Sequence, residues 1–437
     1  MSSIGKATGW GSLQHGIRLA AGLITSIGLA RHLGPDSFGA YQSLLSWALF
    51  FVALSAGGLQ SVVIQRLAIS HSPETILGSV FKLRLAWTGL AVLLCTGIPL
   101  ALNWPQADLI GVAILVPVLA FQMADLPDYL FQSRLEMKPA LISRTVGSLV
   151  SLAVMGLGIL LDQSVWFFLV AFALEQFLGF FLIWIANQKS GVPFSAWRFD
   201  SGVALDLSRA AWPMLISTIS LVLYTRIDLV MLKSLSSAEQ TGFYAASSRL
   251  SQLWTFVPMI LVNAAFPLLA RTRQKDSQAY AQQLRALFSL LGALGLVLAL
   301  SLSIGAPWIS TLLLGESFRP VAPMLAIQGF VALCYFLRTG LDRWLVTENL
   351  TRFSLIIHAG TALTNIGLNF ILVPRLGGSG AAIASLAAMS FGLVVIPLFI
   401  PATRPGGLQA LRGTLGLFHL MTAKGRRACV GLLRSGG

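Results

Sequence analysis

Charged side chains are scarce in this sequence. Lys and Arg number 30 and Asp and Glu only 16, and together they make up 11% of the 437 residues. Soluble domains carry roughly 25% charged residues, and a water-exposed surface cannot be built from so few. The shortage excludes an ordinary water-soluble domain and indicates that lipid is the solvent of most of the chain.

The residue patterns that mark enzymes are missing as well. The sequence contains no phosphate-binding loop, no nucleophile elbow and no pair of metal-ligand spacings. Its histidines are dispersed, and the three cysteines, Cys95, Cys334 and Cys429, lie too far apart to form a disulfide framework or a metal motif. The sequence therefore predicts a protein that is not an enzyme and that carries no metal or organic cofactor.

Apolar length is what the sequence has in abundance. Hydrophobic residues make up 56% of the chain, and its mean hydropathy is +0.78. The apolar runs reach about twenty residues without alternating, which favours membrane-spanning helices over the strands of a barrel. We expect an all-α polytopic membrane protein with twelve spans, at residues 12–33, 40–64, 79–101, 108–131, 142–161, 165–187, 211–232, 243–267, 284–306, 321–342, 353–374 and 379–400.

Lys and Arg are unevenly distributed over the segments that connect these spans. With the N-terminus in the cytoplasm, 22 of the 30 fall on the cytoplasmic side, and only Arg31, Lys233, Arg319 and Arg375 fall outside. Cytoplasmic loops of membrane proteins carry such an excess. The pattern predicts an even number of spans and two cytoplasmic termini. It also attributes the net charge of +14 to topology and anionic headgroups rather than to a nucleic-acid partner.

An internal repeat divides the chain. The motif FGAYQ at residues 38–42, after the first span, resembles TGFYAA at 241–246, after the seventh. The loop at residues 136–139 corresponds to the loop at 349–352. Two parallel repeats of six helices explain both matches. Transporters are often built from such halves and bind their substrate between them.

The repeat predicts four regions. Residues 1–190 form an N-terminal six-helix bundle, 191–210 a cytoplasmic linker, 211–401 a C-terminal six-helix bundle, and 402–437 a basic cytoplasmic tail. Leucines recur at helical spacing in the tail, with basic residues beside them. We therefore expect the tail to form an interfacial helix on the cytoplasmic leaflet.

Four arginines, Arg18, Arg226, Arg249 and Arg338, fall inside predicted spans. A charge at a helix centre costs on the order of 2.5–3.5 kcal/mol on insertion scales. One interpretation is snorkelling to the headgroups or structural pairing, and Arg338 has Asp342 one turn away on the same helix face. In the other interpretation, the guanidinium groups line a cationic lumen between the halves and bind phosphate or carboxylate groups of a substrate.

Three carboxylates inside predicted spans are candidates for ion coupling. Glu175 lies near the middle of the sixth span, Asp228 in the seventh, and Asp125 in the fourth, where it shares a helix face with Asp128. A membrane-embedded carboxylate can bind a proton or a sodium ion and so couple transport to a gradient. Structural pairing with a buried cation is the alternative for each of them.

Three segments resemble bacterial polysaccharide flippases of the O-antigen and exopolysaccharide type, which belong to the multidrug/oligosaccharidyl-lipid/polysaccharide exporter superfamily. They are residues 30–68, beginning ARHLGPDSFGAYQ, residues 226–250, beginning RIDLVMLKS, and residues 377–389, GGSGAAIASLAAM. The resemblance implies two six-helix bundles in a V-shaped, alternating-access fold. It also implies a cargo of undecaprenyl-diphosphate-linked oligosaccharide, flipped from the cytoplasmic to the periplasmic leaflet of the bacterial inner membrane.

The same resemblance implies partners and an alternative. The partners are membrane lipids and the glycosyltransferases and polymerase of a lipopolysaccharide or exopolysaccharide pathway, and the protein itself is expected to be a monomer. Arg18 is the position that would match a first-helix arginine in the cationic cavity of the related lipid II flippases. The multidrug exporters share the fold, so an ion-coupled small-molecule exporter is the alternative. Their typical cargo is cationic, and an arginine-bearing lumen would repel it.

Overall fold

The protein is described by a computed structural model over residues 3–70 and 72–416, with side chains described from Ile24 onward, except those of Leu221 and Tyr224. Within these ranges the chain is helical and contains no strand. It divides into two compact units, Met1–Val230 and Met231–Gly437. The first unit thus includes the predicted linker, 191–210, and most of the predicted seventh span, 211–232. The predicted domain boundaries stay a prediction.

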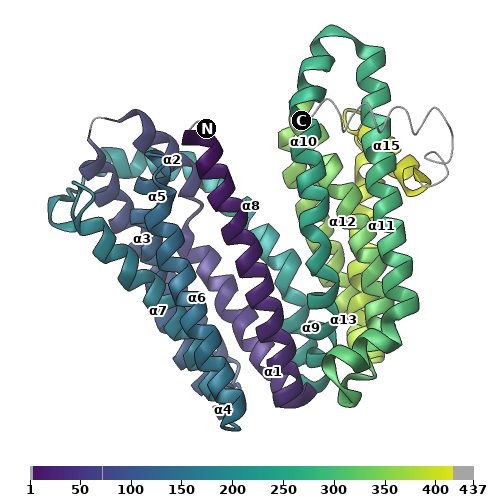
Figure 1. Ribbon diagram of the computed structural model, residues 1–437, viewed down its shortest axis with the longest axis horizontal. Coiled ribbons are helices and arrows are strands. Elements are labelled where there is room, and N and C mark those ends of the chain that lie inside the picture. Colours follow the sequence, from purple (N-terminus) through teal and green to yellow (C-terminus); the bar gives the residue numbers. More distant parts are fainter. Residues whose placement is uncertain (1–2, 71, 417–437) are drawn as a thin grey trace. The chain divides into compact units, whose positions relative to one another are not determined.

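The first unit consists of helices joined by short turns (Figure 1). α1 packs against α3, α4, α6 and α7. The elements are α1 (Ser3–Ala56), α2 (Gln60–Ile69), α3 (Pro73–Ala101), α4 (Gln106–Phe121), the 3₁₀ turn η1 (Gln122–Ala124), α5 (Asp125–Ser133), α6 (Met137–Leu160), α7 (Val165–Gln188), the 3₁₀ turn η2 (Phe194–Ala196) and α8 (Ser201–Leu235), whose last five residues belong to the second unit.

The second unit is built around α12, which packs against α9, α10, α11 and α13. Its elements are α9 (Ala238–Gln252), the 3₁₀ turn η3 (Leu253–Thr255), α10 (Phe256–Lys275), α11 (Ser277–Leu314), the 3₁₀ turn η4 (Glu316–Phe318), α12 (Val321–Thr347), α13 (Thr351–Ser390), the π-helical segment η5 (Phe391–Val395), α14 (Ile396–Phe399) and α15 (Arg404–Thr414).

The number of membrane spans follows from helix length. The described residues hold nine apolar helical stretches long enough to cross a membrane, and a tenth if the bent α8 counts as one span. Two of the nine, Ile24–Ile69 and Thr351–Phe399, have 46 and 49 residues. At 1.5 Å per residue each is about 70 Å long, twice what a single span needs. Each stretch therefore holds two spans. With α8 counted as one span, the described chain has twelve, which confirms the predicted polytopic all-α fold.

Two glycines divide these long stretches. Gly34 in α1 has φ +70° and Gly377 in α13 has φ +54°, and both lie outside helical geometry. The left-handed region is sterically costly for residues with a Cβ, so glycine fits there. Pro35 follows Gly34 directly and is preorganised for the first turn of the next helix. The sequence signals at Gly34-Pro35 and Gly377-Gly378 therefore mark true span boundaries.

Two turns at corresponding places in the halves, after α5 and after α12, have the same hydrogen bonding, a geometry that the turns at Asn103 and Asp162 also have. Leu135 and Asn349 have φ +60° and +58° and occupy the same position in turns that lie 214 residues apart. In the first turn, Arg134 N donates to Leu130 O at 3.2 Å. In the second, Glu348 N donates to Trp344 O at 2.9 Å. The predicted alignment, which paired Glu136 with Asn349, is wrong by one residue. The shared turn conformation defines how the two halves align, because the side chains of Leu135 and Asn349 differ.

Within the second unit, α15 packs against α11 and α12 through its small residues. Gly406, Gly407, Ala410 and Gly413 are buried, and Figure 1 shows α15 beside α11 and α12, which it contacts. The sequence analysis expects an interfacial helix here. The structure packs the small-residue face of this helix on α11 and α12 and leaves Leu408, Leu411 and Leu415 exposed. Small residues allow this close backbone approach between helices.

Gly292→Ala is expected to lower the midpoint of thermal unfolding by several degrees. A Cβ at Gly292 of α11 would overlap with the backbone carbonyl of Gly413, so α15 would have to move away. Gly89→Ala is the matched control, because Gly89 is also helical and has open space where its Cβ would lie. Thermal unfolding of both purified variants measures the difference. Equal midpoints would contradict the described packing of α15.

Candidate functional site

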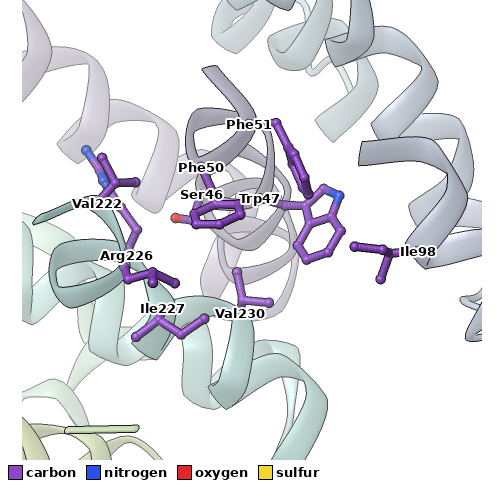
Figure 2. A pocket seen from close by; sticks show the side chains of 10 residues that line it. Ser46, Trp47, Phe50, Phe51, Ile98, Val222, Arg226, Ile227 and Val230 are labelled. Carbon is purple, nitrogen blue, oxygen red and sulfur yellow. The ribbon is translucent and has the colours of Figure 1, made fainter. Parts of the chain in front are cut away.

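A cavity of about 180 Å³ lies within the first unit. Figure 2 shows its aromatic side chains, Trp47, Phe50 and Phe51 of α1, together with Ile98 of α3. The opposite wall is a row of α8 residues at helical i, i+4 spacing, namely Val222, Leu223, Arg226, Ile227 and Val230. Of the residues that line the cavity, Arg226 alone is charged, and the surface that faces the cavity is apolar.

The aromatic wall of this cavity is held in place by its neighbours. Trp47 Nε1 donates a hydrogen bond of 3.0 Å to the carbonyl oxygen of Cys95. The Trp47 ring lies 5.0 Å from Phe51 in an edge-to-face arrangement and 4.9 Å from Trp104. The sequence analysis does not connect Trp47 with Arg226, because α1 and α8 are far apart in the sequence. The cavity is therefore apolar on both sides, and Arg226 contributes its hydrocarbon stem to the α8 wall.

A second group of charged residues lies inside the first unit. Arg84 of α3 has no exposed side-chain surface. Its Nη2 donates to Asp125 Oδ2 at 3.0 Å and to the carbonyl oxygen of Gln122 at 2.5 Å. At the 3₁₀ turn η1, the Gln122 carbonyl oxygen accepts from the backbone N–H of Asp125 as well as from Arg84. The turn therefore shapes the site of the buried guanidinium.

Arg144 of α6 completes this network. Its Nη2 donates to Asp128 Oδ2 at 2.5 Å and lies 3.5 Å from Asp125 Oδ1. Arg84 and Arg144 lie within helices and pair with carboxylates, and the sequence analysis does not predict this pairing. The signal that could have found them is the Asp125 and Asp128 pair, since two carboxylates on one helix face require cations nearby.

Asp125 is therefore held between two guanidinium groups, those of Arg84 and Arg144. A carboxylate in this arrangement already has the electrostatic partners that another cation would supply. Its predicted role in ion coupling stays a prediction. Glu175 accepts a hydrogen bond of 2.8 Å from Ser148 Oγ, and Asp228 is buried on α8. Their coupling roles stay predictions as well.

In the second unit, Arg338 joins α12 to the π-helical segment η5. Its Nε donates to Asp342 Oδ1 at 3.1 Å, and its Nη1 donates to the carbonyl oxygen of Gly392 at 3.2 Å. π-Helical segments within α-helices occur frequently at functional sites. His358 of α13 places Nε2 3.6 Å from the same Asp342 oxygen. The structure gives Arg338 a structural partner, and its predicted place in a cationic lumen stays a prediction.

A chain of neutral polar side chains crosses the second unit. Tyr244 Oη and Ser385 Oγ lie 3.0 Å apart, and Asn365 Nδ2 donates to the same Ser385 oxygen at 3.4 Å. Asn369 Nδ2 donates to Asn365 Oδ1 at 3.2 Å. The sequence analysis missed this group because it considers only charged residues within spans. Two asparagines at i, i+4 in an apolar helix are the signal that identifies one polar helix face.

The remaining predicted arginines are placed as follows. Arg18 belongs to α1, and its side chain lies outside the described residues. Arg249 lies on α9 of the second unit, whereas Arg226 lies in the first. The predicted cationic lumen stays a prediction. Within the described residues, no group of three or more His, Cys, Asp or Glu side chains is arranged to hold a metal ion.

Twelve spans, two repeated helical units and charged groups buried within them define a polytopic membrane protein of the transporter type. The fold is similar to that of an inward-facing multidrug resistance MATE family transporter of the MOP superfamily, with a TM-score of 0.70, 14% identity, and coverage of 95% of this chain and 96% of that one. The lipid II flippase MurJ in an inward closed conformation gives a TM-score of 0.70 at 14% identity and 97% coverage of both chains. These similarities establish the fold.

The family is shown by the sequence. The family described as polysaccharide biosynthesis protein matches residues 4–273, more than half of the chain, and the protein belongs to this family. The chain is also 25% identical over 400 residues to the "Probable flippase AglR" of Haloferax volcanii, covering 87% of this chain and 80% of that protein. The predicted family resemblance is confirmed.

Proposed function

We propose that this protein flips an undecaprenyl-diphosphate-linked oligosaccharide from the cytoplasmic to the periplasmic leaflet of the bacterial inner membrane. The observation that carries the proposal is the apolar cavity of the first unit, whose lining brings Trp47 and Phe50 of α1 together with Arg226 of α8. Family membership and the similarity to a protein named as a probable flippase support the same function. The protein acts as a transporter and not as an enzyme.

The chemistry of the cavity fits one part of such a cargo. Its volume of about 180 Å³ is below the range of pockets that enclose a whole small molecule. It therefore accommodates only a section of a larger ligand. A guanidinium binds phosphate with a planar fork of donors, and apolar aromatic walls suit hydrocarbon. The section with both properties is the junction of the diphosphate and the polyprenyl chain.

Transport proceeds by alternating access through a cationic lumen, to which Arg18, Arg249 and Arg338 also contribute. A proton or sodium gradient supplies the energy, with Glu175 and Asp228 as candidate coupling groups. Both termini are cytoplasmic, and the protein acts as a monomer. Glycosyltransferases supply the lipid-linked intermediate, and a polymerase uses it after flipping, in lipopolysaccharide or exopolysaccharide synthesis.

Arg226→Ala tests this function directly. Loss of a charge-assisted hydrogen bond of about 1.5–3 kcal/mol predicts a roughly 10- to 100-fold fall in glycan export. Arg226→Lys keeps the charge but not the planar fork, so it should restore part of the activity. The measurement is the amount of lipid-linked intermediate that accumulates on the cytoplasmic leaflet.

Arg412→Ala is the matched control, because Arg412 is an exposed arginine on α15. Its export should equal that of the unchanged protein. Normal export by Arg226→Ala at a normal protein level would contradict the proposed role of the cavity. Export of a small cationic compound, with no flipping of the glycan, would favour the multidrug-type exporter instead.

A further inference from the structure

The internal repeat places two ion pairs in equivalent positions. Asp128 precedes Leu135, the positive-φ residue of the first repeated turn, by seven positions, and Asp342 precedes Asn349 of the second turn by the same number. Nine positions after each turn residue the chain carries a basic partner, Arg144 in the first unit and His358 in the second. The two halves therefore share one device, an acidic residue before the turn and a basic residue after it.

The chemical difference between the two pairs lies in the basic residue. Arg144 remains charged at any physiological pH, whereas an imidazole gains and loses its proton between about pH 5 and pH 8. Arg144 makes a hydrogen bond of 2.5 Å to Asp128. His358 Nε2 lies 3.6 Å from Asp342 Oδ1, which is close enough for an ion pair and too long for a hydrogen bond.

The two pairs differ in the exposure of the carboxylate. The side chains of His358 and Asp342 are 31% and 35% exposed, whereas those of Arg144 and Asp128 are 40% and 5% exposed. Both residues lie close to the turn at the ends of α12 and α13, on the side that the sequence analysis assigns to the cytoplasm. A proton therefore has access to His358, and the resulting charge has Asp342 as its partner.

Other groups face this pair from the same helices and from η5. On α12, Arg338 donates to Asp342, and the phenol of Tyr335 interacts with the same carboxylate. From η5, the carbonyl oxygen of Gly392 accepts from Arg338. With His358 neutral, Arg338 and Asp342 balance each other. Protonation makes two cations share Asp342, as Arg84 and Arg144 already share Asp125 in the first unit.

We propose that His358 and Asp342 form a proton-binding site of the second unit. The first unit carries a permanently charged version of the same pair, and the second unit carries a version that responds to pH. Arg338 connects the site to η5, because it bonds to Asp342 and to Gly392 at the same time. When Asp342 interacts more with protonated His358 and less with Arg338, the hydrogen bond that Arg338 donates to Gly392 of that π-helical segment changes as well.

The proton-binding site does not depend on the cargo. The further claim that its protonation drives transport rests on the proposed flippase function. An ion pair that forms only when His358 is protonated stabilises the folded protein at low pH, and the stabilisation disappears as the pH rises. Two experiments therefore separate the site from its use, one on stability and one on export.

The first experiment measures thermal unfolding of the purified full-length protein in detergent from pH 5 to pH 8. The unfolding midpoint of the unchanged protein should exceed that of His358→Gln by about 2 °C at pH 5, and the two should coincide at pH 8. The unfolding midpoint of His358→Arg should exceed that of His358→Gln at every pH from 5 to 8, because arginine remains charged over this range. The difference at pH 5 should also vanish when Asp342 is replaced by Asn in both proteins.

His32→Gln provides the matched control, because His32 lies 3.8 Å from Asp162 but that carboxylate is 99% exposed. An ion pair whose carboxylate is fully exposed contributes little, so this variant should follow the pH dependence of the unchanged protein. If His358→Gln shows the same pH dependence as the unchanged protein, the proton-binding site is overturned.

The second experiment measures glycan export between pH 5 and pH 8. Export by His358→Arg should no longer depend on pH over this range. A pH profile that is unchanged in His358→Arg overturns the coupling role and leaves the proton-binding site in place. A positive stability result combined with no glycan flipping by the unchanged protein contradicts the proposed function alone.

Discussion

Arg84→Met is expected to destabilise the first unit by about 3–5 kcal/mol, the cost of breaking a buried ion pair by removal of one partner. The guanidinium of Arg84 is fully buried, and it neutralises Asp125 and bonds to the carbonyl oxygen of Gln122. Methionine fills a similar volume but leaves both acceptors without this donor. Asp125 then depends on Arg144 at 3.5 Å. Chemical or thermal unfolding in detergent measures the change.

The double variant Arg84→Met with Asp125→Asn is the control for this prediction. Replacing both members of a buried ion pair is often close to neutral, whereas removing one leaves a buried charge without its partner. The double variant should therefore recover most of the stability that the single variant loses. If Arg84→Met is as stable as the unchanged protein, the described network does not contribute to the fold.

Gly78→Ala is expected to detach the segment 192–200 from α3. A Cβ at Gly78 would overlap with the backbone N, C and O atoms of Arg198. The same docking includes a hydrogen bond of 3.1 Å from Arg198 N to Glu74 O and one of 3.1 Å from Asp200 N to Ser79 Oγ. Loss of these contacts, at about 1 kcal/mol for each hydrogen bond, should lower the stability of the first unit by about 2–4 kcal/mol.

Limited digestion with trypsin provides the second measurement for Gly78→Ala. Trypsin cleaves after Lys and Arg, so a detached segment should be cut at Lys189 and Arg198 much faster than in the unchanged protein. Gly97→Ala is the control, because a Cβ at this helical position of α3 meets no atom within 4 Å. Equal rates of cleavage in the two variants would mean that the segment is not held by its contact with Gly78.

The docking of this segment shows where sequence reasoning stopped. Residues 191–210 look like a linker because they are polar and glycine-containing, and composition does not show what a backbone touches. In the structure, Trp197 packs edge-on against Phe81 and Phe194, and its Nε1 donates to Val192 O. The contact with Phe81 joins residues more than a hundred positions apart, and no local pattern encodes it.

The pairing of Arg84 and Arg144 was missed for a related reason. Both residues lie near the ends of the predicted spans 79–101 and 142–161, and hydropathy does not show which side chains of neighbouring helices meet. In the structure, α3 and α6 bring both guanidinium groups to Asp125 and Asp128. The sequence does contain the acidic half of the network, as an i, i+3 pair.

Hydropathy, charge asymmetry and the repeated motifs were enough to determine that this protein is an all-helical membrane protein with twelve spans in two related halves. That much is local, because lipid requires each spanning segment to satisfy its own backbone hydrogen bonds and to present apolar side chains. Only the tertiary structure decided which charges are partners, how Trp47 and Arg226 come to line one cavity, and that His358 takes the place of Arg144 in the second half. These depend on contacts between distant helices, for which the membrane imposes no sequence period.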